Sequence, residues 1–120
     1  MATVHGSYYL ESPPFDTSTA SGPVILGFYR WLNSDSHPNM HNTIDVFNGS
    51  TWINLWTSGF SWIQDAPPAG VGWTYVSIEI TNYKNANMRI RFGFDVGSMA
   101  VASGGSWNID DVLVAAAPCP

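Results

Sequence analysis

The chain has 120 residues, of which 45% are hydrophobic and 11% are charged, and its formal net charge is -5. This length suits one domain with a single hydrophobic core, and the apolar content argues against a disordered segment. Four Lys and Arg stand against nine Asp and Glu. The composition therefore argues against nucleic acid and anionic membrane as partners, since both attract clustered cations.

The ends of the chain show no targeting signal. Residues 1–5 lack the basic region and apolar run of a signal peptide, and no apolar stretch is long enough to span a bilayer. Cys119 is the only cysteine, which excludes an internal disulfide. We assign residues 1–115 to one domain and interpret residues 116–120 as a tail or the start of a linker.

Two strands are predicted near the start of the chain. Residues 8–12 form a short candidate that two prolines stop. Residues 24–32 are rich in β-branched and aromatic side chains, which favours a central strand with Leu26 and Phe28 in the core. By the same alternation Tyr29 and Trp31 face away from the core, and residues 33–42 are expected to form a polar loop.

A β-hairpin is the clearest local signal. Residues 43–47 and 50–56 flank an Asn-Gly pair at 48–49, which favours the turn that matches strand twist. With a two-residue loop, Val46 lies opposite Thr51. This register gives a core face made of Ile44, Val46, Ile53 and Leu55. It gives an opposite face made of Asp45, Phe47, Trp52, Asn54 and Trp56.

The second half of the chain continues the strand pattern. Residues 58–72 contain prolines and glycines and are expected to form a long loop, whereas residues 73–80 and 88–95 alternate between apolar and polar side chains. No segment has the period of an amphipathic helix. About seven short strands separated by turn signals predict an all-β fold, an antiparallel two-sheet β-sandwich.

The last predicted strand, residues 107–114, contains two adjacent carboxylates in an apolar run. Alternation puts Asp110 and Asp111 on opposite faces, so at least one of them is expected at the edge of the core. An ionised group there needs hydrogen bonds or a cation. Two interpretations stay open: a hard cation such as calcium, which takes six to eight oxygen ligands, or hydrogen bonds to loop amides.

The ordered set of motifs along the chain resembles a known group of domains. The motifs are Ser12-Pro13 with Phe15-Asp16, Leu26-x-Phe28, Gly49-Ser50-x-Trp52, Trp73 before an alternating strand, Arg89-x-Arg91-Phe92 and Trp107-x-Ile109-Asp110-Asp111-Val112. They cover nearly the whole chain. The chain is similar to MAM-like and carbohydrate-binding jelly-roll modules, which are non-catalytic accessory domains of secreted enzymes and adhesins.

This resemblance implies a jelly roll and a structural calcium that joins the first strand to the last. The implied ligands are Glu11 and Asp110, with Asp16 and Asp111 nearby. The disulfides of animal MAM domains are absent, which favours an accessory module of a secreted bacterial protein over a protein-adhesion domain. An extracellular location and neighbouring domains in a larger protein are implied as well.

The expected function is binding rather than catalysis. Glu11 and Glu79 are the only glutamates, and the aspartates follow no recognisable acid/base pairing, so no catalytic residue is expected. Flat aromatic rings suit pyranose faces, while Asn and Arg can bond sugar hydroxyls. The predicted ligand-binding residues are Tyr29, Trp31, Trp52, Asn54, Trp56, Arg89 and Arg91.

We expect these residues to bind an extended polysaccharide of the β-glucan type. One alternative is a MAM-like module that binds protein in a secreted protease or surface protein. Another is that the rings only cover the sheet or contact a neighbouring domain.

Overall fold

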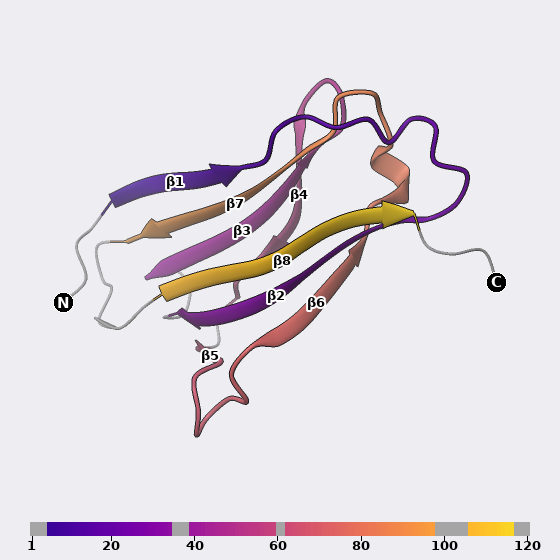
Figure 1. The fold of residues 1–120 in the computed structure, drawn as a ribbon. Helices are drawn as coiled ribbons and strands as arrows, with labels where there is room; N and C mark the ends of the chain where they lie inside the picture. The colour runs from indigo at the N-terminus through magenta and orange to yellow at the C-terminus, as the bar shows by residue number, and fades with distance from the viewer. Residues whose placement is uncertain (1–4, 35–38, 60–61, 98–105, 117–120) are drawn as a thin grey trace.

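The computed structural model describes residues 5–34, 39–59, 62–97 and 106–116, and more than half of these residues belong to β-strands (Figure 1). The strands are β1 (His5–Glu11), β2 (Val24–Ser34), β3 (Met40–Phe47), β4 (Trp52–Thr57), β5 (Ile63–Gln64), β6 (Thr74–Glu79), β7 (Arg89–Val96) and β8 (Ser106–Ala116). One 3-10 turn, η1 (Thr81–Tyr83), follows β6. No helix in these described ranges is long and apolar enough to cross a membrane.

The strands form two antiparallel sheets of four strands each. The β1 sheet has the order β1-β7-β3-β4, and in the β2 sheet the central β2 pairs with β8, β6 and the short β5. Among the described strands, only the β3–β4 and β5–β6 connections stay within one sheet. The predicted all-β, two-sheet antiparallel sandwich is confirmed.

The core lies between the sheets and is built from alternating side chains of their central strands. Leu26 and Phe28 of β2 are fully buried, as predicted, and the Phe28 ring packs edge to face on Phe92 of β7 with centroids 5.2 Å apart. Ile44 and Val46 of β3 join the same cluster. Burying one such side chain stabilises the fold by about 1.5–3 kcal/mol relative to leaving it exposed.

The hairpin between β3 and β4 has a longer loop than predicted. Val46 pairs with Ile53 rather than Thr51, because residues 48–51 form a four-residue loop closed by the Asn48 N–H, which donates to the Thr51 carbonyl at 3.0 Å. The Asn48 side chain also accepts from the Thr51 N–H. The observed pairing differs from the predicted pairing by two residues, an even number, so the side chains next to the loop point to the predicted faces.

A β-bulge farther along β4 does change the faces. Asn54 pairs with Asp45 and Trp56 pairs with Ile44, which leaves Leu55 as an extra residue. Trp56 is therefore turned inward, and it packs against the core and against the Trp107 ring at 6.2 Å. The prediction that Trp56 lies on the outer face is wrong, because alternation does not continue through a bulge.

A second irregularity lies at the two adjacent carboxylates of β8. Gly27 pairs with Leu113 while Tyr29 pairs with Asp110, so the pairing shifts register between them, and Asp111 adopts a left-handed backbone with φ 52°. Both carboxylates are exposed. The expectation that one of them lies at the edge of the core is wrong, because the bulge replaces the alternation that the expectation assumed.

Several predicted boundaries also move. β2 continues to Ser34 and β3 begins at Met40, so the polar loop between them is shorter than expected, and residues 35–38 lie outside the described part. β5 lies within the expected loop 58–72. β8 extends to Ala116, which pairs with Val24, so the strand includes the first residue of the predicted tail.

Candidate functional site

The seven predicted ligand-binding residues do not share one surface. Tyr29 and Trp31 lie on the outer face of the β2 sheet, whereas Trp52, Asn54, Arg89 and Arg91 lie on the outer face of the β1 sheet. These two faces are on opposite sides of the sandwich. Trp56 packs in the interior. The other six residues, which were expected to form one binding surface, therefore belong to two separate surfaces.

On the β1 sheet, Arg91 is the centre of a closed set of contacts. Its guanidinium carbon lies 4.1 Å from the centre of the Tyr9 ring and 4.2 Å from that of the Trp52 ring. Its Nε donates to Asp45 Oδ2 at 2.8 Å, while Asn54 Nδ2 donates to Asp45 Oδ1 at 2.9 Å. The side chains around Asp45 leave that residue only 7% exposed.

Arg89 extends the same layer toward the hairpin loop. Its guanidinium carbon lies 4.4 Å from the centre of the Phe47 ring, and its Nη1 lies 3.4 Å from Glu11 Oε1. The rings of Phe47 and Trp52 pack with centroids 5.5 Å apart. Both arginines therefore already have aromatic and carboxylate partners, so this surface has the character of a stabilising layer.

On the β2 sheet, four rings form a surface that we call the aromatic face: Tyr29, Trp31, Trp73 and Tyr75. Tyr29 packs edge to face on Tyr75 with centroids 5.2 Å apart, and Trp31 packs on Trp73 with centroids 5.8 Å apart. Tyr29, Trp73 and Tyr75 are 41%, 45% and 58% exposed. Exposed aromatic side chains that lie next to one another form an apolar patch that is available to a ligand.

Sequence reasoning missed Trp73 and Tyr75, although a signal was present. Val76 and Ile78 of β6 were expected to face the core, and both pack against it. Alternation then requires the odd-numbered residues of the same strand to face outward. Alternation over the whole predicted strand, residues 73–80, would have placed both rings on the face that holds Tyr29, although β6 itself begins at Thr74.

Two glycines allow the rings to lie close to the sheet. A Cβ at Gly27 would clash with the Tyr75 hydroxyl oxygen, so the Tyr75 side chain covers this position. Gly72 has φ 88°, a left-handed conformation that favours glycine, and a Cβ there would be 3.4 Å from the Trp31 ring.

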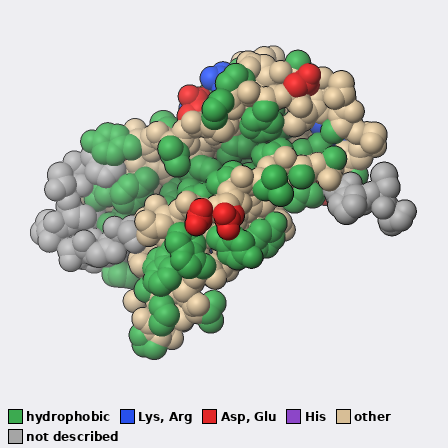
Figure 2. Space-filling view, viewed as in Figure 1, with side chains coloured by type: hydrophobic (Ala, Val, Ile, Leu, Met, Phe, Trp, Pro, Cys, Tyr) green, Lys and Arg blue, Asp and Glu red, His purple; other side chains and the backbone are tan. Residues whose placement is uncertain are grey.

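β8 supplies polar groups beside the rings. Asp110 is directly opposite Tyr29, and Asn108 is directly opposite Trp31. Trp73, Asn108 and Asp110 also border one shallow hollow of about 440 Å³, whose remaining lining is Leu10, Trp107 and Ile109. Figure 2 shows acidic side chains over the middle of β8 with hydrophobic side chains around them.

The four carboxylates expected to bind calcium are dispersed. Glu11 contacts Arg89 on the β1 sheet, whereas Asp110 and Asp111 lie on β8 of the other sheet. Asp16 accepts hydrogen bonds from the Ser18 hydroxyl and the Ser18 backbone N–H, which hold the pKa of that carboxyl below its usual range. These residues do not fit one calcium site that joins the first strand to the last.

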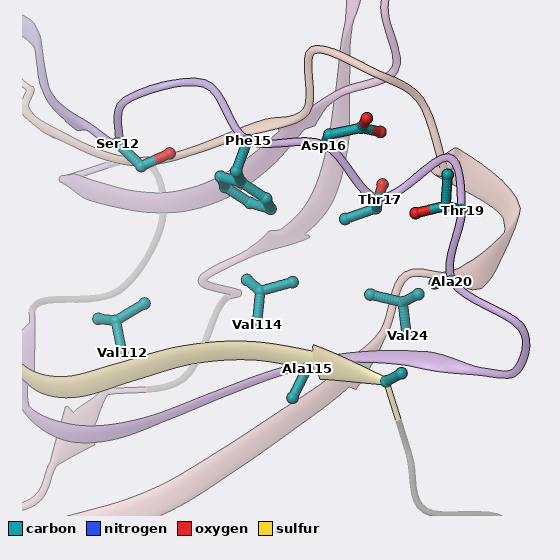
Figure 3. Close-up of a pocket in the computed structure, with 11 residues that line it drawn as sticks. Ser12, Phe15, Asp16, Thr17, Thr19, Ala20, Val24, Val112, Val114 and Ala115 are labelled. Atoms are coloured by element: carbon teal, nitrogen blue, oxygen red, sulfur yellow. The ribbon is translucent and has the colours of Figure 1, made fainter.

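A second hollow, of about 610 Å³, lies between the β1–β2 connection and the end of β8 (Figure 3). Phe15 points into it from the connection, while Val112 and Val114 point into it from β8. Ser12, Asp16, Thr17 and Thr19 supply the polar part of its lining. Its walls are mainly apolar, and no group of three or more His, Cys, Asp or Glu side chains occurs anywhere in the described ranges.

Within the described ranges, the aromatic face is the outer face that combines exposed rings with polar side chains that have few internal contacts. Asp110 accepts one hydrogen bond, from the Asp111 N–H at 2.8 Å. Such a surface can stack on flat apolar faces and exchange hydrogen bonds with hydroxyl or amino groups. No protein-family model and no curated protein matches the chain.

Proposed function

We propose that this domain is a non-catalytic carbohydrate-binding module that binds an extended β-linked polysaccharide, such as a β-glucan, through the aromatic face. The observation that carries the proposal is the pair of edge-to-face ring contacts on an exposed sheet surface, bordered by Asp110 and Asn108. Rings of this kind bury the C–H faces of pyranoses at a small cost in side-chain entropy.

The arrangement of the rings favours a chain over a single sugar. Tyr29 and Trp31 are two residues apart on β2, about 7 Å at the usual strand rise. Tyr75 of β6 packs on Tyr29, and Trp73, which directly precedes β6, packs on Trp31. Several modest contacts must add together to offset the cost of association. An extended ligand that contacts both pairs of rings meets this requirement better than a monosaccharide.

The resemblance to accessory modules supports the remaining parts of the proposal. In this proposal the domain is extracellular and belongs to a larger secreted protein that acts on polysaccharide, and chemistry on the glycan is carried out by another domain. A structural calcium is not part of the proposal, since the carboxylates expected to hold it are dispersed.

A pair of tryptophan variants on opposite faces tests the proposal. Trp73→Ala should weaken binding to a soluble β-glucan by at least about fivefold, because truncation of a contact aromatic commonly costs more than 1 kcal/mol. Trp52→Ala, on the outer face of the β1 sheet, should lower the melting temperature through the lost Arg91 contact while leaving glycan affinity unchanged. Affinity gel electrophoresis and thermal melts measure both.

Two results would contradict the proposal. If Trp52→Ala abolishes binding and Trp73→Ala does not, the ligand lies on the β1 sheet. If neither face binds any glycan and the aromatic-face variants instead lose a protein partner, the MAM-like protein-binding alternative gains support.

A further inference from the structure

We infer that the aromatic face prefers polysaccharides that carry protonated amino groups over neutral and anionic ones, an inference that rests on the function proposed above. The relevant class is a β-linked chain of amino sugars with free amines. Two observations carry it: exposed rings share one surface with carboxylates that form no ion pair with a described residue, and the Lys and Arg side chains have other partners.

The rings themselves attract cations. An ammonium group over the face of Trp or Tyr is attracted by the ring quadrupole, and Trp is the strongest of the aromatic residues in this respect. The exposed parts of Trp73, Tyr75 and Tyr29 are available for such contacts. The structure shows the domain using the same interaction internally, since Arg91 lies between two rings on the opposite sheet.

Carboxylates stand next to these rings. Asp110 is opposite Tyr29 and borders the same hollow as Trp73, and Asp111 follows it at the bulge. Their only mutual contact is the bond from the Asp111 N–H to the Asp110 side chain, and neither forms an ion pair with a described residue. Glu79 of β6 is a further exposed carboxylate of the β2 sheet.

None of the four Lys and Arg of the chain lies among the rings. Arg30 belongs to β2, but alternation places it on the inner side of the sheet with Phe28, beside a hollow that Ile44 also lines. Arg30 donates to both oxygens of Asp65, at 2.8 and 2.9 Å, and Lys84 donates to the Ala20 carbonyl at 2.9 Å. Arg89 and Arg91 belong to the β1 sheet. The aromatic face is therefore negatively charged, which repels uronate or sulfated chains and attracts an amine.

Matched oligosaccharides test the inference. The probes are a β-1,4-linked glucosamine hexasaccharide, its fully N-acetylated counterpart with the same backbone, a neutral gluco-hexasaccharide and an oligouronate. Calorimetric titrations use low salt and a pH at which the amines are protonated. We expect the free-amine hexasaccharide to bind about tenfold more tightly than the acetylated one, a difference of about 1.4 kcal/mol, and the oligouronate to bind most weakly.

The double variant Asp110→Asn/Asp111→Asn should abolish this tenfold preference, so that the free-amine and the acetylated hexasaccharides bind with equal affinity. Asparagine tolerates the left-handed backbone at position 111, so the bulge is retained. Asp16→Asn, compared with the single variant Asp110→Asn, is the control for charge, because it removes one exposed carboxylate outside the face and should keep the preference. Added salt should reduce the preference in the unmodified domain.

The outcomes separate the two proposals. Equal affinity for free-amine and acetylated chains, or a preference that survives in the Asp110→Asn/Asp111→Asn variant, overturns the inference and leaves glycan binding intact. A preference lost equally in Asp16→Asn shows only general attraction of a polycation to an acidic protein and also overturns it. If none of the four probes binds, the proposed function itself fails.

Discussion

Arg91 illustrates how a residue that looks like a ligand-binding group in the sequence can be a structural one. Its charge, its outward direction and its aromatic neighbours all suggest a sugar contact. In the structure its guanidinium is enclosed by Tyr9, Trp52 and Asp45. A planar cation between two rings, bonded to a buried carboxylate, stabilises the outer layer of the β1 sheet.

Replacement of Arg91 should therefore affect stability more than binding. We expect Arg91→Ala to lower the free energy of unfolding by about 2–3 kcal/mol, because it leaves the Asp45 carboxylate buried without its cation. Arg91→Lys should recover only part of this loss, since an ammonium cannot stack in the same planar way. Urea denaturation measures both changes, and a loss below 0.5 kcal/mol, on the order of a surface substitution, would contradict this assignment.

At the scale of single elements, the two bulges explain most differences between prediction and structure. Alternation within regular strands correctly placed Leu26, Phe28, Val46 and Ile53, because hydrophobic pattern and pleat have the same period. Nothing in the local sequence marks Leu55 as an extra residue. The side-chain direction of Trp56 depends on how β4 pairs with β3, which is a property of two strands together.

The bulge at Leu55 predicts how Trp56→Ala will behave. Because Trp56 packs against the core and Trp107, its truncation should lower the free energy of unfolding by about 2–4 kcal/mol. Glycan affinity, measured under conditions where the variant is folded, should stay the same. Tyr75→Ala is the contrasting variant: it removes an exposed ring of the aromatic face, so it should weaken binding with little change in the melting temperature.

At the scale of the whole molecule, the sandwich has two outer faces with different chemistry. On its outer face the β1 sheet pairs arginines with rings and carboxylates, whereas the outer face of the β2 sheet presents rings and carboxylates. Arg30 of β2 is paired with Asp65 on the inner side of that sheet. The sequence correctly predicted the fold class and the outward direction of six of the seven candidates. It could not assign them to one sheet or the other, since sheet membership depends on crossovers between distant segments.

The outermost strands of the sandwich also carry apolar side chains. β1 pairs only with β7 and β8 only with β2 among the described strands, and Leu10 and Val112 are exposed there. Exposed edge strands with apolar side chains favour pairing between molecules. We expect Leu10→Lys to reduce concentration-dependent light scattering of the purified domain, with a change in stability within about 1 kcal/mol.

Ser7→Lys on the same strand is the control, because it adds the same charge and removes no apolar side chain. If both variants reduce scattering equally, charge alone explains the effect and the apolar edge has no role.

Gly27 has a further consequence for how the aromatic face could diversify. Because Tyr75 lies across the position that a Cβ would occupy, any other residue there must push the ring away from β2. A single methyl group at this buried position would thereby move an exposed ring of the aromatic face without replacing any exposed side chain. Related proteins could then acquire different ligand preferences through a residue that contact mapping would never identify, and a library of binding variants could begin with Ala, Ser and Thr at position 27.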